Sequence, residues 1–439
     1  MPFPLHTLGA RQLLRVESDA ARATNINGYV WPAKKLPLTV APKPVVPVNP
    51  PFSPVIDLPV RPGPMLTRLG KVTTPASGAP EFHLARRWAW VRYCWAFADR
   101  IGAASPLRLS AAAFGLTQHH RHALSEDLGI AVALEAAERY LLTGQPLGTR
   151  VEPVDVDEAL LAGAVGGMSV AYAAGTRMRP DYLLVRTASG QPPQLFALEC
   201  KGTHSGPVGL QTLHKAAAQV QGLEVGPAGV PAGGPGWGPP SGLIGGASFD
   251  NHRIRLQLYD PPGDRRWDVE PAARGRRSEA APVVSVRADG SVQVDDIPRF
   301  NLLLRDVSEA RLLTLAGRED AAAARLGQWP GDRPSARAAT ERQVRRDDDL
   351  GDFDGAVLRL PLEARDVVEV FFGVERDIAD AIQADDDKAK EAALENWRTR
   401  RGDGDDAGDG ALVSTSPADD SLTVALDDGI LMRAGRASN

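Results

Sequence analysis

The sequence is poor in cysteine and contains no segment of a secretory or membrane type. Its two cysteines, Cys94 and Cys200, cannot form a disulfide framework, which favours a reducing compartment. The N-terminus has no basic segment followed by an apolar run, so it does not resemble a secretory signal. No stretch offers the ~20 strongly apolar residues that a membrane span needs. These absences predict a soluble, cytoplasmic protein without a membrane partner.

Common sequence motifs of nucleotide-binding proteins and of serine hydrolases are also absent. The sequence contains no phosphate-loop motif, no dinucleotide-binding fingerprint and no G-x-S-x-G nucleophile motif. The run Gln118–His122 supplies three histidines, but their spacing matches no common zinc pattern and no cysteine lies nearby. These observations argue against an NTP-driven motor, and they predict a solvated or phosphate-facing loop at the histidine run.

The net charge of −5 is unevenly distributed along the chain. Residues 341–439 contain 13 lysines and arginines against 25 acidic residues, whereas the other 340 residues contain 37 against 30. The sequence therefore predicts a mildly basic body with an acidic tail region. Because nucleic acids are polyanions, the basic body is compatible with a nucleic-acid substrate, although the average charge argues against one.

Composition divides the chain into three predicted segments. Residues 1–80 form an N-terminal segment, residues 81–260 an α/β core, and residues 261–439 an additional α+β region that is acidic from about residue 341. Prolines crowd residues 32–64 and favour an extended arm or spacer over a packed domain. This arm either docks on a protein partner or serves as a plain tether. The C-terminal region is a second candidate for binding such a partner.

The core shows a regular order of helices and strands. Ser125 is the predicted N-cap of a helix that continues to Leu142. Strands are predicted at 169–175, 181–187 and 194–202, followed by a helix at 209–222, a Gly/Pro-rich linker at 226–242, and strands at 243–250 and 253–260. This order predicts an α/β fold.

The strand at 194–202 carries the most informative residues. Its alternation places Phe196, Leu198 and Cys200 on one face and Ala197, Glu199 and Lys201 on the other. If strands 181–187 and 194–202 pair, Asp181 lies next to Glu199. Two carboxylates at one point form a hard-oxygen site for Mg²⁺ or Mn²⁺. The Cys200 thiol, on the apolar face, is predicted to be buried and structural.

Such a site suits phosphodiester hydrolysis. A metal ion polarises the phosphate and lowers the pKa of a bound water, while Lys201 orients that water or offsets developing charge. The alternative is that Asp181 simply begins a strand after a turn and that Glu199 and Lys201 form a solvent-facing ion pair.

Pro180-Asp181 and Glu199-Cys200-Lys201 resemble the motif of the PD-(D/E)XK nuclease superfamily over about residues 123–260. The resemblance implies a restriction-endonuclease-like mixed sheet flanked by helices, with a divalent-metal site at the ends of the two strands. It also implies a glutamate on the preceding helix and a glutamine or basic residue on the following one. Glu126 is the candidate glutamate, and Glu135 is a competitor whose partner Arg139 indicates a solvated pair.

The motif and its neighbours give a complete set of candidate site residues. The catalytic residues are Asp181, Glu199 and Lys201, and the metal ligands are Glu126, Asp181, Glu199 and Cys200, the last through its backbone carbonyl. The substrate-binding residues are Gln211 and Lys215, which share a helix face with Gln219, together with Arg253 and Arg255. Further arginines follow at residues 265–277 around Trp267, where they either contact phosphates and a base or form a solvated loop.

Two functions of different classes remain open at this level. The first is a Mg²⁺- or Mn²⁺-dependent endonuclease that acts on DNA more than on RNA, by analogy the effector subunit of a bacterial antiviral defence system. The second is a catalytically silent protein of the same fold that acts as an assembly or interaction subunit.

Overall fold

A computed structural model describes most of the chain. The described residues are 5–35, 37–73, 88–98, 105–146, 149–165, 168–188, 194–227, 232–233, 236–250, 253–261, 284–286, 292–294, 309, 312–313, 316, 318, 321, 342–347, 350–361, 367–401, 411–416, 421–426 and 430–436. No helix among them is long and apolar enough to cross a membrane.

The chain forms two compact units that do not coincide with the three predicted segments. The nuclease-like unit, as we call it after its sequence resemblance, comprises residues 13–59 and 104–304, and the C-terminal unit comprises residues 1–12, 60–103 and 305–439. The first 80 residues are therefore shared between the two units. A division into consecutive segments misses this, because it cannot register contacts between residues that are far apart in the sequence.

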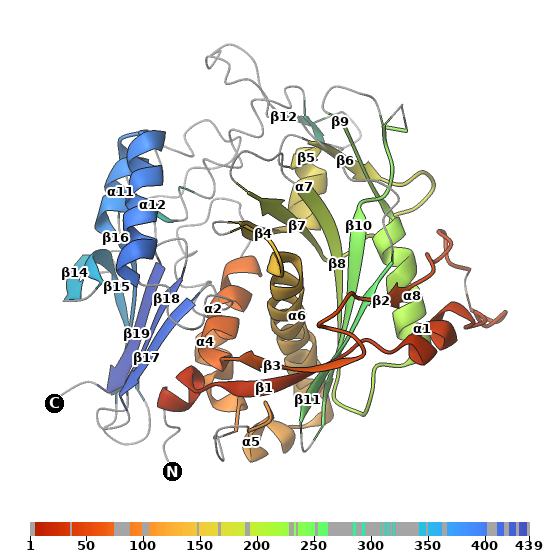
Figure 1. The fold of residues 1–439 in the computed structure, drawn as a ribbon, viewed down its shortest axis with the longest axis horizontal. Coiled ribbons are helices and arrows are strands. Elements are labelled where there is room, and N and C mark those ends of the chain that lie inside the picture. Colours follow the sequence, from red (N-terminus) through yellow and green to blue (C-terminus); the bar gives the residue numbers. More distant parts are fainter. Residues whose placement is uncertain are drawn as a thin grey trace. The chain divides into compact units, whose positions relative to one another are not determined.

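A large mixed sheet forms the centre of the nuclease-like unit (Figure 1). Its strand order is β3-β1-β11-β10-β8-β7-β4, with β2 added to β11. Strand β7 is antiparallel to both β4 and β8, β10 is parallel to β8, and β11 is antiparallel to β10. The strands are β1 (Gln12–Glu17), β2 (Val46–Pro47), β3 (Val55–Val60), β4 (Arg150–Asp155), β7 (Tyr182–Thr187), β8 (Gln194–Thr203), β10 (Ser241–Phe249) and β11 (Ile254–Asp260).

Helices cover both faces of this sheet, which confirms the expected α/β class with a mixed sheet flanked by helices. Helix α6 (Gln118–Leu142) packs on one face, and α8 (Leu210–Gln221) packs on the other with α1 (Ala20–Asn27) beside it. The unit also contains α5 (Ala111–Phe114), α7 (Val156–Ala162), a small sheet of β5 (Ala164–Val165), β6 (Met168–Tyr172) and β9 (Leu223–Pro227), and the hairpin β12 (Val284–Val286) and β13 (Val292–Val294).

Glycines allow α6 to lie very close to β8. A Cβ atom on Gly202 would lie 1.7 Å from the carbonyl oxygen of Ser125, and one on Gly129 would lie 3.1 Å from the Cα of Gly202. These small residues bring the backbone of the helix against the strand that carries Glu199 and Lys201.

We expect Gly202→Ala to destabilise the nuclease-like unit by about 3 kcal/mol or more, because the added methyl group meets backbone atoms that cannot rotate away. Urea denaturation followed by far-UV circular dichroism measures the effect. Gly209→Ala is the matched control, since a Cβ there meets no atom within 4 Å. Equal stability of the two variants would contradict the close packing.

The start of α6 corrects two predictions. The helix begins at Gln118, after Thr117, and not at Ser125. Ser125 is fully buried inside the helix, where its hydroxyl donates to the carbonyl of His122 at 2.8 Å. The histidine run is therefore helical and not a loop. The error arose because Ser-Glu-Asp has the residue types of a helix start, while the residues before it are equally compatible with a helix.

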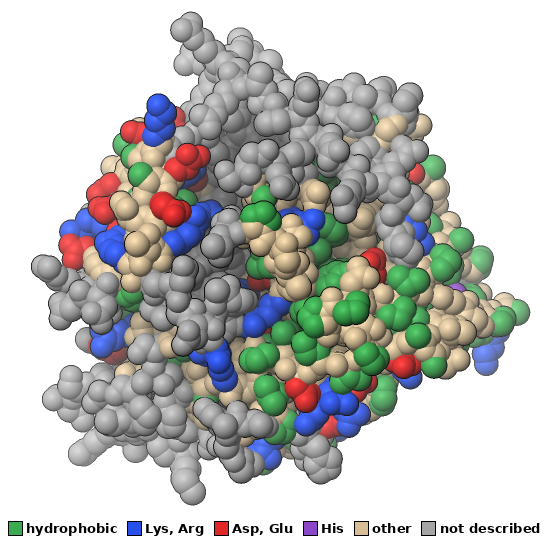
Figure 2. Space-filling view, in the orientation of Figure 1, with side chains coloured by type: hydrophobic (Ala, Val, Ile, Leu, Met, Phe, Trp, Pro, Cys, Tyr) green, Lys and Arg blue, Asp and Glu red, His purple; other side chains and the backbone are tan. Residues whose placement is uncertain are grey.

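The proline-rich segment is packed against its own unit, which corrects the prediction of an extended arm. Val45, Val48 and Phe52 are buried. The N–H of Val45 donates to Oδ1 of Asn27 at 2.8 Å, and the N–H of Val48 donates to Oγ of Ser18 at 2.9 Å. Side chains thus satisfy donors that a proline-rich backbone cannot place in a regular ladder. Figure 2 shows apolar side chains gathered over this part of the unit.

The C-terminal unit is built on an antiparallel sheet with strand order β14-β15-β16-β19-β18-β17. The strands are β14 (Arg342–Asp347), β15 (Gly351–Pro361), β16 (Val367–Glu375), β17 (Ala411–Ser416), β18 (Ser421–Leu426) and β19 (Ile430–Arg436). Its helices are η1 (Leu5–Gly9), α2 (Pro62–Val72), α4 (Trp88–Tyr93), η2 (Cys94–Ala96), α11 (Arg376–Gln383) and α12 (Asp387–Arg401). The segment Thr423–Ala434, with Asp-Asp-Gly between two apolar runs, predicts a hairpin, and β18 and β19 form it. The sequence also predicts a helix at 307–326, which lies largely outside the described residues.

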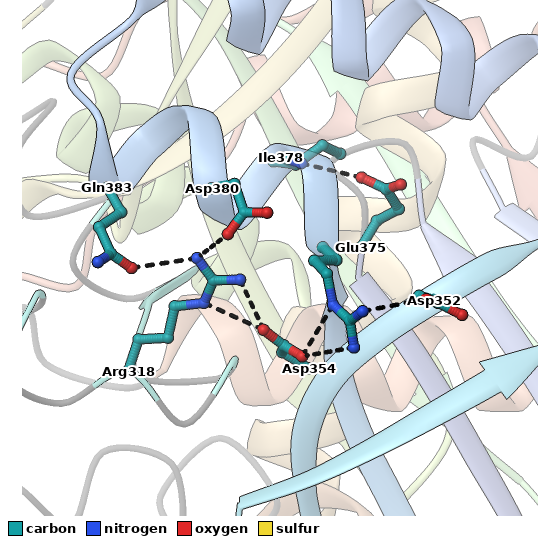
Figure 3. Close-up of polar contacts among 8 residues, drawn as sticks. Arg318, Asp352, Asp354, Glu375, Ile378, Asp380 and Gln383 are labelled. Atoms are coloured by element: carbon teal, nitrogen blue, oxygen red, sulfur yellow. Dashed lines mark hydrogen bonds and ion pairs between the residues drawn. The ribbon is translucent and has the colours of Figure 1, made fainter.

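Buried charges link the parts of this unit (Figure 3). Asp354 on β15 is fully buried, and its Oδ2 accepts from Nε and Nη2 of Arg318 at 3.1 and 2.6 Å. Its Oδ1 accepts from Nε and Nη2 of Arg376, both at 3.4 Å. Arg318 also pairs with Asp380 of α11. Both carboxylate oxygens are therefore satisfied, as a buried charge requires.

Candidate active site

The residues of the predicted motif meet where β7 pairs with β8. Asp181 lies directly before β7, and its N–H donates to the carbonyl of Leu198 at 3.2 Å. The N–H of Cys200 in turn donates to Oδ2 of Asp181 at 2.8 Å. The backbone of β8 thus holds the Asp181 carboxylate beside the strand that carries Glu199, as the sequence predicted for paired strands.

The alternation of β8 also follows the prediction. Lys201 pairs with Gly246, where an added Cβ would meet Leu213 of α8, whereas Cys200 pairs with Gly245, where it would meet Ala133 of α6. Lys201 and Glu199, two residues before it, therefore lie on the α8 face. Cys200 lies on the α6 face, is 7% exposed, and has its pKa raised well above the ordinary value by burial. Its thiol is thus buried, as predicted.

Glu199 is more enclosed than a strand-end carboxylate was expected to be. It is 0% exposed, and its Oε1 contacts Nζ of Lys201, whose side chain is 25% exposed. Its second oxygen, Oε2, is shielded from solvent and has no hydrogen-bond partner among the described residues. A buried acceptor without a partner is costly, so this oxygen is available to a cation. The alternative of a solvent-facing ion pair does not describe Glu199, which is fully buried, although Lys201 is partly exposed.

Charges and burial shift the ionisation of all three groups. The pKa of Glu199 is raised to about 8, by burial first and then by the negative charge of Asp181, while Lys201 offsets part of the rise. Burial also raises the pKa of Asp181, against the lowering effect of Lys201. Burial lowers the pKa of Lys201, but the charges of Glu199 and Asp181 outweigh it, so the net shift is upward. This pattern is typical of carboxylates held close together.

The donor set fits a hard divalent cation that keeps several ligands outside the protein. Among the described residues, no group of three or more His, Cys, Asp or Glu side chains is arranged to hold a metal ion. Asp181 and Glu199 supply two carboxylates, which is the usual number for Mg²⁺ where water and substrate phosphate complete the octahedron. The backbone carbonyl of Cys200 stays a predicted ligand.

Glu126 is not brought together with the two carboxylates, which corrects its assignment as a metal ligand. Its side chain is 60% exposed and pairs with Nε2 of His122 at 3.3 Å. Ser125 and Gly129 face Gly202 of β8, and the side chain of Glu126 points about 100° around the helix from that of Ser125. The predicted pair of Glu135 and Arg139 is present at 2.9 Å, but Glu135 is buried and not solvated.

Asp127, the neighbour of Glu126 on α6, acts on the residue that follows Asp181. The pKa of the buried Tyr182, which follows Asp181, is raised by burial and in smaller part by charges that include Asp181 and Asp127. Because Tyr182 pairs with Leu198, which shares the α6 face of the sheet with Cys200, this effect lies on the face opposite Glu199 and Lys201.

Gln211, Lys215 and Gln219 form a polar strip along one face of α8, and Gln219, near the C-terminus of the helix, contacts the segment before Asp181. Nε2 of Gln219 donates to the carbonyl of Arg179 at 3.1 Å, two residues before Asp181. Gln211 is half-buried and Lys215 is exposed, on the same strip. Gln219 thus helps to position the segment that presents Asp181, while the roles of Gln211 and Lys215 stay predictions.

Arg253 and Arg255 lie near the end of the sheet where β8 ends, but both have acidic partners. Arg253 pairs with Asp57 at 3.5 Å and Arg255 with Asp250 at 3.4 Å. These pairs lower the net positive charge that the two arginines would offer a nucleic acid. Trp267 and the arginines at 265–277 lie outside the described residues.

Arg179 is a further residue that the sequence reasoning missed. Its side chain pairs with Asp157 of α7, and its charge opposes the rise that burial causes in the pKa of Asp181. In the sequence, its position directly before Pro180-Asp181 is the signal that could have identified it.

Comparison of the whole chain with protein-family models, with curated proteins and with solved structures finds no match.

Proposed function

We propose that the protein is a divalent-metal-dependent phosphodiesterase of the PD-(D/E)XK type. The observation that carries the proposal is the convergence of Asp181, Glu199 and Lys201 from two paired strands, with one carboxylate oxygen of Glu199 buried and unpartnered. A fully buried carboxylate next to a half-buried one is costly unless a positive charge compensates both, and Lys201 alone supplies one such charge.

Each residue has a distinct role in this proposal. Asp181 and Glu199 bind Mg²⁺ or Mn²⁺, which supplies Lewis-acid polarisation of the phosphate and a water of lowered pKa. Lys201, held by Glu199 and raised in pKa, stays protonated and can donate to the attacking water or to a phosphate oxygen. The N–H of Cys200 fixes the rotamer of Asp181 before any ligand arrives.

The fold supports the proposal at the level of topology. The site lies between neighbouring strands of a mixed sheet with α6 and α8 on opposite faces, as the restriction-endonuclease-like resemblance implies. We extend the proposal to a DNA substrate in preference to RNA, and to a cytoplasmic antiviral effector that a protein partner licenses. That extension rests on analogy with nucleases of this type.

One observation favours the catalytically silent alternative. Glu199 has no exposed surface, and its contact with Lys201 resembles an internal ion pair. A silent protein would keep the pair for structure and would neither bind the metal nor cleave nucleic acid.

Incubation with plasmid, linear DNA and RNA in Mg²⁺, Mn²⁺ or EDTA separates the two functions. We expect metal-dependent cleavage that falls by about 10²- to 10³-fold or more in Asp181→Asn and in Lys201→Ala. Glu126→Gln is the control and should cleave at close to the wild-type rate, since Glu126 is exposed and paired with His122. Cleavage that persists unchanged in Asp181→Asn and Lys201→Ala would exclude this site.

A further inference from the structure

The first turns of α6 meet the chain that leaves β8. Because Gly202 lies directly against the carbonyl of Ser125, the turn before Ser125 comes beside the residues after Gly202. The rings of His122 and His204 have centroids 6.5 Å apart at an angle of 74°. Burial, and in smaller part Arg121 and His122, lowers the pKa of His204, so these three side chains lie close together. We call Arg121, His122 and His204 the basic cluster.

The basic cluster has nitrogen atoms that the protein does not satisfy. Nε of Arg121 and Nδ1 of His204 are shielded from solvent and have no hydrogen-bond partner among the described residues. The carboxylate beside them, Glu126, pairs with His122. Two polar nitrogens from separate elements therefore lack an acceptor on one small surface.

The neighbouring arginines differ in this respect. Arg15 and Arg253 share Asp57 at 3.6 and 3.5 Å, and Arg255 pairs with Asp250. Strand pairing places Arg255 beside Ser248, and Ser248 beside Thr203, at the same end of the sheet. Of the basic groups at this end, the paired arginines are already neutralised, whereas the basic cluster retains capacity for an anion.

We propose that the basic cluster binds a backbone phosphate of a polynucleotide, next to the one held at Asp181 and Glu199. The proposal rests on the proposed function, because it places both phosphates on one strand. His204 follows Lys201 by three residues, which span at most about 11 Å of extended chain. Because the basic cluster lies on the α6 side of β8 and Lys201 on the α8 side, the polynucleotide would pass around the end of β8. A guanidinium matches phosphate geometry, and an imidazole ring adds one N–H donor, whereas an arginine would repel a metal ion.

Binding without cleavage tests the proposal. Fluorescence anisotropy in EDTA compares a labelled single-stranded DNA oligonucleotide on the wild type, on Arg121→Ala/His204→Ala and on Arg150→Ala. Arg150 is the matched control, since it pairs with Thr187 at the opposite end of the sheet. We expect the double variant to raise the Kd about tenfold and to reduce the slope of log K against log salt by about one, with Arg150→Ala within about twofold of wild type. Arg121→Lys, which keeps the charge, should retain most of the salt slope.

The outcomes separate this proposal from the proposed function. Unchanged DNA binding in the double variant, or an equal loss in Arg150→Ala, would overturn the basic cluster even if Asp181→Asn abolishes cleavage. Loss of binding in the double variant alone supports it, even if the wild type cleaves nothing and the hydrolytic function fails. Titration with inorganic phosphate, followed by NMR of His204, identifies the source of the anion. Binding of free phosphate without any effect of the double variant on DNA would overturn the polynucleotide assignment.

Discussion

Glu199→Gln is expected to abolish cleavage and, in the absence of metal, to make the protein more stable at pH 8 than the wild type. The two effects have opposite signs because the proposed catalytic role requires a charge that the fold disfavours. Glu199 is fully buried, and its pKa is raised from 4.5 to about 8 by burial and by Asp181, despite Lys201. A glutamine keeps an oxygen for Lys201 and removes the titration.

The sign follows from proton binding. Between pH 4.5 and about 8 the folded protein holds a proton on Glu199 that the unfolded chain has lost. The free energy of unfolding of the wild type therefore falls as pH rises through this window, by at most about 5 kcal/mol in all. The contribution of Glu199 to the free energy of unfolding is fully present below pH 4.5, its pKa in the unfolded chain. It is lost as the pH rises through about 8, its pKa in the folded protein. In Glu199→Gln this pH dependence should largely disappear.

Urea denaturation at the two ends of this window, with EDTA or with excess Mg²⁺, measures both effects. We expect Mg²⁺ to stabilise the wild type at pH 8, because the metal binds the deprotonated carboxylate, and to leave Glu199→Gln unchanged. Glu126→Gln is the control, and its exposed pair with His122 should contribute less than about 1 kcal/mol. A variant that retains the full pH dependence would contradict the raised pKa of Glu199.

The strand-level features of the site were predictable because their signals are local. The alternation along Phe196–Lys201 fixes which side chains share a face, whatever the rest of the chain does. The position of Asp181 at the start of the preceding strand then follows from antiparallel pairing of neighbouring strands. Helix α8 was equally clear, since Leu210–Gln221 has a strong apolar stripe between two glycines.

Features that depend on distant contacts were not predictable in this way. Strand β1 joins the sheet through parallel pairing of Arg15 with Arg255, 240 positions away in the chain, and no local pattern encodes that partner. Helix η1 likewise contacts β17 and β18 within the C-terminal unit. The rotation that turns Glu126 outward is set by backbone packing of Ser125 on Gly202. Periodicity marks an amphipathic element, but only its tertiary partner decides its rotation and its neighbours.

The second large effect is expected at Asp354, far in the sequence from the candidate active site. We expect Asp354→Ala to destabilise the C-terminal unit by about 3–5 kcal/mol, because it removes the carboxylate between two guanidinium groups. Arg318, whose side chain is 7% exposed, would keep Asp380 and Gln383 as partners but lose two hydrogen bonds. The buried positive charge that remains is the main cost.

Differential scanning calorimetry of the full chain, with the transition of the C-terminal unit resolved from the other, measures this loss. Asp352→Ala is a matched control, since Asp352 lies two residues away on β15, pairs with Arg376 at 3.1 Å, and is 41% exposed. Exposed pairs contribute about 1 kcal/mol or less, so Asp352→Ala should shift the transition little. Asp354→Asn keeps an acceptor oxygen but no charge and should fall between the two. If Asp354→Ala and Asp352→Ala were equally mild, the buried charges would not hold α11 and residue 318 to the sheet.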